Sequence, residues 1–299
     1  MKVLVTGTSG QLGHDVMLEL KKRGYDGLGA DRSGSDKTEY ETTVMDITDA
    51  EAVNRVMEEY HPDAVVHCAA WTNVDGAEDP ENLAAVRKVN VDGTANIAKA
   101  CKKIGAKMVY ISTDYVFNGQ GTEPWKPDDK NYAPLNVYGQ SKLDGEKAVT
   151  ENTDDYFIVR IAWVFGKNGK NFVKTMLRVG NEHEEVRVVD DQIGTPTYTP
   201  DLARLLVDMI ETDKYGFYHA TNEGGFISWA DFTKEIFKQA GIKSKVTPVT
   251  TAEYGVSVAA RPFNSRLDKS KLKENGFTPL PTWQDALSRY LKELENAEQ

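Results

Sequence analysis

A tyrosine and a lysine lie four positions apart, at Tyr138 and Lys142, in a segment that begins at Asn136. Residues at this spacing share one face of a helix, and Asn136 is a favourable residue to cap its start. A free tyrosine has a pKa of about 10, which is too high for easy proton exchange at neutral pH. An ammonium about 4 Å away favours the phenolate by about 4 kcal/mol at an effective dielectric of about 20. We therefore expect Lys142 to lower the pKa of Tyr138.

Two hydroxyl residues and an acid, Ser112, Thr113 and Asp114, end an apolar run that is typical of a β-strand. Open parallel sheets bind ligands at the carboxyl ends of their strands, so Thr113 is expected near the helix that carries Tyr138. With a reduced nicotinamide, Thr113, Tyr138 and Lys142 form a set suited to ketone reduction. Tyr138 would donate a proton to the carbonyl oxygen, and Thr113 would hydrogen-bond that oxygen. Lys142 would also hold the nicotinamide ribose.

A glycine-rich turn lies between the strand-like run 2–6 and the helical pattern 11–23. Gly7 permits a tight turn, Gly10 lets the backbone approach a phosphate, and Gly13 lets the helix pack closely on the strand. A pyrophosphate at a helix N-terminus needs bare amide groups and the positive end of the helix dipole. The spacing alone is a weak signal, but its place at the first strand–helix junction predicts a dinucleotide cradle.

Two neighbouring residues of opposite charge, Asp31 and Arg32, end the second strand-like run. A carboxylate at this place accepts hydrogen bonds from the adenosine ribose and favours NAD, because it repels a 2′-phosphate. Arg32 would instead bind that phosphate, so the coenzyme preference stays open. Asp46 and Ile47 end the third apolar stretch and would flank the adenine, with a helix cap as the alternative role of Asp46.

Strand-like and helical segments alternate through the first half of the chain. Strands are predicted at 2–6, 25–30, 64–69, 107–112 and 157–163, and helices at 11–23, 49–60, 81–104 and 137–151. Strands separated by helices need crossover connections, so we predict an α/β fold with a parallel, doubly wound, Rossmann-like sheet. Beyond residue 165 the pattern loosens, and helices are expected at 171–179, 200–211, 229–240 and 283–294. We predict a dinucleotide-binding domain over 1–165 and a smaller substrate-binding α/β lobe mainly over 166–299, with an interleaved boundary.

Composition and charge exclude several classes of protein. The 299 residues are 40 % hydrophobic and 27 % charged, as in ordinary globular chains. The net charge of −10 argues against binding nucleic acid over a broad face. No apolar run approaches the roughly 18 residues of a membrane span. The two cysteines, Cys68 and Cys101, form no CxxC motif and the histidines form no HExxH motif, so we expect a reduced, soluble, cytoplasmic protein.

Two motifs together indicate a family. Residues 6–13 have the form TGxxGxxG and residues 138–142 the form YxxxK, and on these the chain resembles the extended short-chain dehydrogenase/reductase family. Within that family it is similar to the reductases that convert the C4 ketone of dTDP-4-dehydro-β-L-rhamnose to dTDP-L-rhamnose. The further matching stretches are 112–117, 134–139, 171–177, 190–197 and 261–267. They span most of the chain, so the resemblance implies the whole enzyme, with NADPH or NADH as coenzyme and a dTDP-sugar as substrate.

Matched position by position, the resemblance also implies individual contacts. Coenzyme contacts are implied for Gly10, Gln11, Leu12, Asp31, Asp46, Ile47, Ala70, Trp71, Thr72, Ile111, Tyr138 and Lys142. Sugar contacts are implied for Thr113, Asp114 and Trp163. Trp71 is a departure, because relatives carry a histidine there beside the nicotinamide. Asp15 stands where some relatives, in a magnesium-bridged dimer, have a glutamate; the other ligands have no match, so we expect no metal, and a homodimer is possible.

Residues of the second lobe have physical roles of their own. Arg261 and Arg266 suit a diphosphate, because guanidinium groups match phosphate oxygens, and exposed surface arginines are the alternative. Trp163, just past a strand, would stack on a sugar or a base, with a core position as the alternative.

Two other functions stay open on the sequence. A sugar-nucleotide epimerase or dehydratase of the extended family would share the glycine turn and YxxxK, although a dehydratase usually has more acidic residues directly after the threonine than Asp114 alone. A non-catalytic, NADP-binding regulatory subunit, similar to the beta subunit of methionine adenosyltransferase, would keep the coenzyme cradle. The intact set Thr113, Tyr138 and Lys142 disfavours that use.

Overall fold

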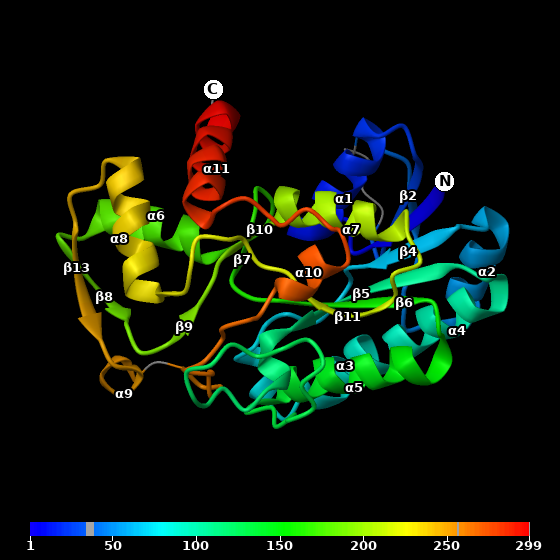
Figure 1. The fold of residues 1–299 in the computed structure, drawn as a ribbon, viewed down its shortest axis with the longest axis horizontal. Helices are drawn as coiled ribbons and strands as arrows, with labels where there is room; N and C mark the ends of the chain where they lie inside the picture. The colour runs from blue at the N-terminus through cyan, green and yellow to red at the C-terminus, as the bar shows by residue number, and fades with distance from the viewer. Residues whose placement is uncertain (34–38, 256, 299) are drawn as a thin grey trace.

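The computed structural model describes residues 1–33, 39–255 and 257–298, and within them seven strands form one parallel sheet in the order β11-β6-β5-β4-β1-β2-β3 (Figure 1). The strands are β1 (Lys2–Thr6), β2 (Asp26–Asp31), β3 (Thr42–Val44), β4 (Ala64–His67), β5 (Lys107–Thr113), β6 (Tyr156–Ile161) and β11 (Gly216–His219). The strand order reverses between β1 and β4, which is where doubly wound sheets bind ligands. The predicted α/β, doubly wound fold is confirmed.

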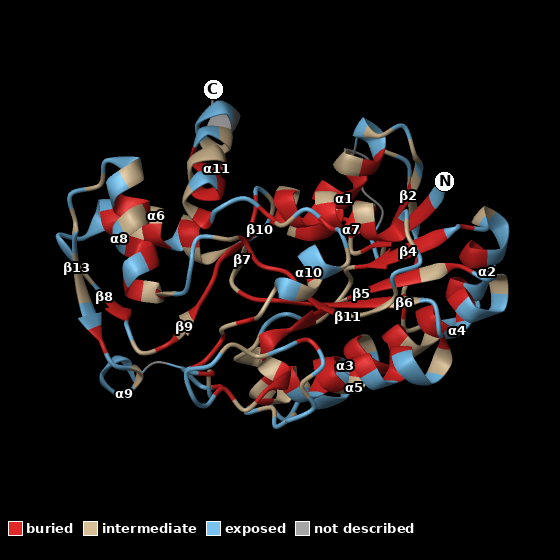
Figure 2. Ribbon diagram, in the orientation of Figure 1, coloured by how far each residue is buried: buried red, intermediate tan, exposed pale blue. Residues whose placement is uncertain are grey.

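Helices cover both faces of this sheet, as Figure 1 shows. α1 (Gln11–Lys22) and α7 (Thr199–Ile210) pack on one face, and α2 (Ala50–Tyr60), α4 (Thr94–Ile104) and α5 (Val137–Asn152) pack on the other. Successive strand residues point to opposite faces, so Leu4 joins one apolar layer and Val5 the other. The central strands are accordingly the most buried part of the ribbon in Figure 2. Among the described helices, none is both long and apolar enough to cross a membrane.

Side-chain caps begin four of the predicted helices, α2, α5, α6 (Phe172–Glu182) and α8 (Trp229–Ala240). Asp49 accepts hydrogen bonds from the first amides of α2, and Asn136 accepts one from the Gly139 amide at 2.7 Å at the start of α5. The single helix expected over 81–104 is wrong in detail. The structure has α3 (Leu83–Arg87), then a π-helical segment η2 (Lys88–Gly93), then α4. Apolar spacing does not signal a π-helical turn, whose hydrogen bonds run from residue i to residue i+5.

The chain beyond residue 165 contributes to two places. α7 and β11 belong to the layers of the central sheet, and α10 (Ser270–Glu274) packs beside β11. The rest forms a smaller lobe, at the left of Figure 1, with α6 (Phe172–Glu182), α8 (Trp229–Ala240), α9 (Thr251–Tyr254) and α11 (Trp283–Glu298). Its paired strands are β7 (Val164–Phe165) with β10 (Thr197–Tyr198), β9 (Ile193–Gly194) with β12 (Ile227–Ser228), and β8 (Glu185–Val189) with β13 (Lys245–Val249). The expected division near residue 165 stays a prediction.

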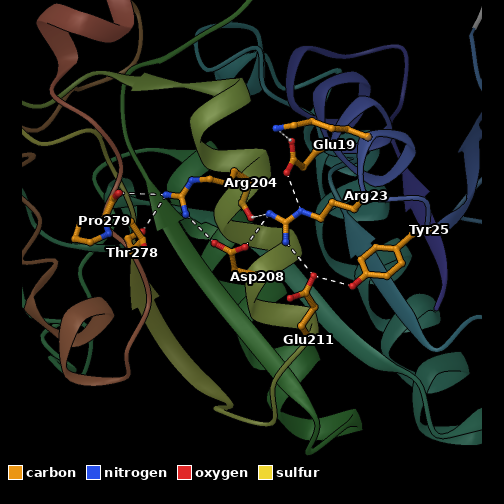
Figure 3. A network of polar contacts seen from close by, with 9 residues as sticks. Glu19, Arg23, Tyr25, Arg204, Asp208, Glu211, Thr278 and Pro279 are labelled. Atoms are coloured by element: carbon orange, nitrogen blue, oxygen red, sulfur yellow. Dashed lines mark hydrogen bonds and ion pairs between the residues drawn. The ribbon is translucent and has the colours of Figure 1, made fainter.

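A cluster of charged side chains joins α1 to α7 (Figure 3). Three carboxylates lie 2.8 to 2.9 Å from the guanidinium of Arg23: Glu19, Asp208 and Glu211. Arg204 of α7 also pairs with Asp208, and it donates hydrogen bonds to the carbonyl oxygens of Thr278 and Pro279. The cluster therefore links the start of the chain to a segment near its end. Because these side chains are partly exposed, salt weakens the attraction between them.

A buried ion pair ties α5 to the sheet. Arg160 on β6 and Glu146 on α5 are both buried, and two guanidinium nitrogens donate to the two carboxylate oxygens at 2.8 Å. Ser112 on β5 donates to the same carboxylate at 2.5 Å. Other donors of Arg160 reach the Pro127 carbonyl and the Tyr132 hydroxyl, each at 3.0 Å. The pair thus holds α5, β5, β6 and the loop before α5 in one arrangement.

We expect Arg160→Met to lower the free energy of unfolding by about 3–5 kcal/mol, because the Glu146 carboxylate is then buried without its cation. Chemical denaturation followed by far-UV circular dichroism measures this loss. The pair Lys234–Asp231 is the matched control, since both side chains are about half exposed, and Lys234→Met should change the value by less than about 1 kcal/mol. The double variant Arg160→Met/Glu146→Leu should recover most of the loss. A loss in Arg160→Met no larger than that of the control would contradict this account.

Candidate active site

A cleft of about 1020 Å³ opens at the carboxyl ends of the strands, between the sheet and the smaller lobe. This volume is at the upper end of ligand pockets, which span roughly 300–1,000 Å³. The predicted site residues that line it are Gly7, Gly10, Gln11, Leu12, Gly13, Asp31, Arg32, Asp46, Ile47, Ala70, Trp71, Thr72, Ile111, Thr113, Asp114, Tyr138, Lys142 and Trp163. The structure therefore brings these residues together from segments spread over 157 positions, residues 7 to 163. Arg261 lies outside this lining.

The glycine turn between β1 and α1 has no room for side chains. Gly7 has a φ of +73°, and a Cβ there would lie 2.7 Å from the backbone nitrogen of Ala69. A Cβ on Gly13 would lie 2.4 Å from the Gly7 carbonyl oxygen. Gly10 is the N-cap of α1 and offers no capping side chain, so the first amides of the helix stay free for an anion in the cleft. This turn fits the pyrophosphate of a dinucleotide.

Asp31, at the end of β2, is hydrogen-bonded to that turn. Its Oδ2 accepts from the Ser9 amide at 3.0 Å and from the Ser9 hydroxyl at 2.5 Å, and its Oδ1 accepts from the Arg32 amide at 2.8 Å. Asp46 accepts from the amide of Thr48 at 2.8 Å. Since α2 is capped by another residue, the alternative role of Asp46 as a helix cap is wrong. The coenzyme contacts of Asp31, Arg32 and Asp46 stay predictions.

The phenol of Tyr138 lines the cleft together with Thr113, near enough for the Thr113 hydroxyl to affect its pKa. Thr113 Oγ1 donates to Asp114 Oδ1 at 3.0 Å and accepts from the Tyr115 amide at 3.2 Å. Burial, followed by the negative charge of Asp114, raises the pKa of Tyr138, while the nearby Thr113 hydroxyl lowers it. Burial also raises the pKa of Asp114 to about 6, against hydrogen bonds from Ser265 and Thr113. The phenol is therefore protonated at neutral pH.

Lys142 lies one helical turn after Tyr138, buried over another aromatic ring. Its Nζ is 4.1 Å from the centre of the Tyr110 ring. Burial lowers the pKa of Lys142 to about 7, and the negative charge of Glu146 opposes this shift. The expectation that Lys142 lowers the pKa of Tyr138 is thus wrong for the protein by itself. Burial disfavours the charged forms of both groups, and the carboxylate of Asp114 disfavours the phenolate further.

The loop after β4, which carries Ala70, Trp71 and Thr72, is anchored by Asn90. Asn90 Oδ1 accepts from the Trp71 amide at 2.7 Å, and its Nδ2 donates to the Trp71 carbonyl at 3.1 Å and to Ser141 Oγ at 2.9 Å. Ser141 precedes Lys142 on α5, so the loop and the helix share one anchor. Asn90 is not among the predicted site residues; its signal in the sequence is an asparagine between two valines within a predicted helix.

An aromatic wall from the smaller lobe forms the other side of the cleft. Trp163, with a φ of +52°, stacks on Trp229 with ring centres 3.6 Å apart and planes inclined by 15°. Phe172 contacts Trp229 with ring centres 4.4 Å apart, and all three side chains line the cleft. A Cβ on Gly194 would lie 2.9 Å from the Trp163 ring. Trp163 thus lies on the cleft wall and not in the core. Trp229 and Phe172 are not among the predicted site residues, because no local pattern in the sequence pairs them with Trp163.

Arg261 forms an ion pair with Asp75 and does not line the cleft. Its two terminal nitrogens donate to the two carboxylate oxygens at 3.0 and 2.9 Å. Nearby, Asn136 Nδ2 donates to the Ala260 carbonyl at 2.8 Å, which ties this segment to the start of α5. Arg261 is partly buried, so the alternative of an exposed surface arginine is wrong for it. Arg266 also lies outside the cleft lining, and the diphosphate role of both arginines stays a prediction.

Asp15, which the resemblance relates to a metal-bridged dimer, lies on α1 outside the cleft lining. The residue is 6 % exposed, and burial raises the pKa of its carboxyl to about 6. In the described parts of the chain, no group of three or more histidine, cysteine, aspartate or glutamate side chains is placed to hold a metal ion. The expectation of no metal stays a prediction.

The chain is similar to known proteins over nearly its whole length. The family model described as the RmlD substrate binding domain matches residues 1–296. The spore coat polysaccharide biosynthesis protein SpsK of Bacillus subtilis (strain 168) is 40 % identical over 296 residues, with 99 % of each chain covered. The dTDP-4-dehydrorhamnose reductase of Streptomyces griseus is 40 % identical over 291 residues, 95 % of this chain and 91 % of that protein. The crystal structure of dTDP-4-dehydrorhamnose reductase from Bacillus anthracis str. Ames in complex with NADP is 43 % identical, with a TM-score of 0.89 and coverage of 98 % and 99 %.

We expect Asp31 and Arg32 to set the coenzyme preference in opposite directions. Asp31→Asn removes a negative charge and should raise the ratio of kcat/KM for NADPH over NADH by about tenfold, whereas Arg32→Ala should lower it by a similar factor. Dissociation constants of the two coenzymes, measured by tryptophan fluorescence, give the same ratio without turnover. Variants that shift the ratio in the same direction, or by less than about twofold, would contradict this assignment.

Proposed function

This chain belongs to the RmlD substrate binding domain family, and we propose that it is a dTDP-4-dehydrorhamnose reductase. It reduces the C4 ketone of dTDP-4-dehydro-β-L-rhamnose to dTDP-L-rhamnose with NADPH or NADH. The observation that carries the proposal is that Thr113, Tyr138 and Lys142 line the same cleft as the glycine turn, at the carboxyl edge of the sheet. The proton donor, Tyr138, and the coenzyme-binding glycine turn therefore line the same cleft.

In this proposal Tyr138 is the proton donor to the substrate. When bound, the reduced nicotinamide supplies a hydride to the ketone carbon. Tyr138 begins protonated, because burial and Asp114 raise its pKa, and it passes its proton to the ketone oxygen as negative charge develops there. An alkoxide is a stronger base than a phenolate, so the transfer is favourable even from a phenol of raised pKa. Thr113 hydrogen-bonds the same oxygen and orients it toward the phenol.

Lys142 has a binding role in the same proposal. Its ammonium donates hydrogen bonds to the nicotinamide ribose, and a ligand that accepts them keeps the lysine charged although burial lowers its pKa to about 7. The amides at Gly10, Gln11 and Leu12 hold the pyrophosphate. Ile111 and the loop of Ala70, Trp71 and Thr72 border the nicotinamide, and Asp46 and Ile47 border the adenine.

The substrate occupies the part of the cleft between Asp114 and the aromatic wall. Trp163 offers a flat apolar face to the sugar, and Trp229 holds that face in place by stacking. Arg261 would reach the diphosphate only by leaving Asp75. We place the coenzyme in the domain over 1–165 and much of the substrate site in the lobe over 166–299.

The rival functions differ from the reductase in what they need at this site. A dehydratase needs further acid chemistry beside the threonine, and here the residue after Asp114 is Tyr115. A regulatory subunit needs no proton donor, and it would bind NADP without turnover. We also propose a cytoplasmic homodimer without a nucleic-acid partner; light scattering gives the oligomeric state.

We expect Tyr138→Phe to lower kcat for ketone reduction by at least about 100-fold, because a positioned general acid contributes roughly 10²–10⁴-fold. Absorbance of the reduced nicotinamide, with dTDP-4-dehydro-β-L-rhamnose as substrate, measures the rate, and the variant should bind NADPH as the wild type does. Tyr25→Phe is the control, since Tyr25 belongs to the cluster of Figure 3 and lies outside the cleft lining. A wild type without turnover, or a Tyr138→Phe variant with full turnover, would remove the assignment.

A further inference from the structure

We infer that the ring face of Tyr110 positions the ammonium of Lys142 for the coenzyme, through the attraction between a cation and an aromatic ring. The inference rests on the proposed function, because it concerns the lysine that binds the nicotinamide ribose there. Lys142 lines the cleft, whereas Tyr110 lies outside the cleft lining. Tyr110 therefore acts on the coenzyme through Lys142, as a positioning residue.

The ammonium lies over the ring at a distance at which this attraction is strong. Nζ of Lys142 is 4.1 Å from the centre of the Tyr110 ring, and the two residues are 3 % and 0 % exposed. The face of an aromatic ring carries partial negative charge, and it attracts a cation within about 6 Å, more strongly where water is excluded. The ring thus offsets part of the free-energy cost of burying the ammonium.

The acid one turn further along α5 does not pair with this lysine. Both carboxylate oxygens of Glu146 accept from Arg160 at 2.8 Å, and one of them also accepts from Ser112. Among the described residues, no carboxylate forms an ion pair with Lys142. The thiol of Cys68 is neutral, because burial raises its pKa to about 12. The ring of Tyr110 is therefore the direct contact that favours the ammonium until a ligand enters the cleft.

The ring of Tyr110 is itself fixed by neighbours on α5 and β4. Its hydroxyl donates to the Lys142 carbonyl at 3.2 Å. A Cβ on Gly145 would overlap this hydroxyl and lie 2.7 Å from the Asn90 carbonyl oxygen, so the glycine leaves the space that the phenol fills. His67, the partner of Tyr110 across β4 and β5, stacks on the ring with centres 6.0 Å apart and planes inclined by 24°. The ring cannot leave the lysine without losing these contacts.

Lys142 is the group of this cluster that changes charge near neutral pH. Burial lowers its pKa to about 7. Burial also lowers the pKa of His67 to about 3 and raises the pKa values of Tyr110 and Tyr138, so these three rings are neutral. The other titratable side chains whose charges act on Lys142 or on these rings are the thiol of Cys68, Asp114, Glu146 with its partner Arg160, and Asp144 with its partners Arg87 and Lys147.

The test measures the dissociation constant of NADPH between pH 6.5 and pH 9 by tryptophan fluorescence, in variants that weaken the ring face by steps. Above the pKa of Lys142, a proton must be taken up to form the ammonium, so the affinity falls as pH rises. Tyr110→Phe keeps the ring and should keep the wild-type pH profile. Tyr110→trifluorophenylalanine keeps the shape but removes most of the negative charge from the ring face, and Tyr110→Leu removes the ring.

We expect the pH at which the affinity begins to fall to move down by about half a unit with the fluorinated ring and by about one unit with leucine. At pH 8, NADPH should therefore bind about tenfold more weakly to Tyr110→Leu than to the wild type. The fluorinated variant has the shape of Tyr110→Phe, so its shift measures the charge of the ring face even where leucine disturbs folding.

Tyr218→Leu is the matched control for the loss of a buried tyrosine. Tyr218 is 1 % exposed on β11 of the same sheet, with Lys271 Nζ 5.4 Å from its ring centre and its hydroxyl donating to the Lys214 carbonyl, but it lies outside the cleft lining. It should lower stability and keep the wild-type profile. Lys142→Met should remove the fall in affinity that the other variants shift.

Three outcomes would each overturn the inference: a fluorinated variant with the profile of Tyr110→Phe, a Tyr110→Phe profile shifted as far as that of Tyr110→Leu, or an equal shift in Tyr218→Leu. A Lys142→Met protein with the wild-type profile would overturn it together with the binding role of Lys142. Because the readout is binding, a wild type that gives the expected series but oxidises no NADPH with dTDP-4-dehydro-β-L-rhamnose would remove the proposed reductase function and still support the inference.

Discussion

The buried ion pair between Arg160 and Glu146 is the constraint on which the geometry of the cleft depends. A buried charge lowers the free energy of unfolding by several kcal/mol unless an opposite charge and hydrogen bonds compensate for the lost water. Glu146 meets this demand with Arg160 and Ser112, so α5 is held in one position against β5 and β6. Tyr138 lies on that helix and Thr113 ends β5. The contact between phenol and threonine is therefore set by a charge pair about two helical turns away.

Burial, more than charge pairing, decides protonation inside the cleft. It raises the pKa values of Tyr138 and Asp114 and lowers those of Lys142 and His67, in each case toward the neutral form. The spacing of four between Tyr138 and Lys142 had suggested an ammonium beside a phenolate. A buried site favours the protonated phenol instead. A proton donor to a ketone oxygen must be protonated at the start of the reaction.

The two sides of the cleft are built on different principles. The side with the glycine turn is shaped by backbone, since Gly7 and Gly13 leave no space for side chains and α1 begins without a cap. The opposite side is shaped by side chains from a second lobe, chiefly the stacked rings of Trp163 and Trp229. Several specific contacts join the lobes, among them the ion pair of Arg261 with Asp75 and the hydrogen bonds of Asn171 with Gln11 and of Asn264 with Glu123. The coenzyme side is thus shaped by one domain, whereas the shape of the substrate side also depends on how the second lobe packs against that domain.

The sequence by itself determined the features that act over a few residues. These are the strand–turn–helix at the start of the chain, the cap at Asn136, the alternation that requires a parallel sheet, and the residues of the glycine turn and YxxxK motif. Only the tertiary structure decided that β11 joins the sheet, that Trp229 stacks on Trp163, and that Arg261 turns to Asp75, a partner 186 positions away. It also decided the protonation of Tyr138. The reason is that hydrogen bonding and side-chain spacing are local, whereas burial and the contacts of a folded chain depend on residues that no short pattern connects.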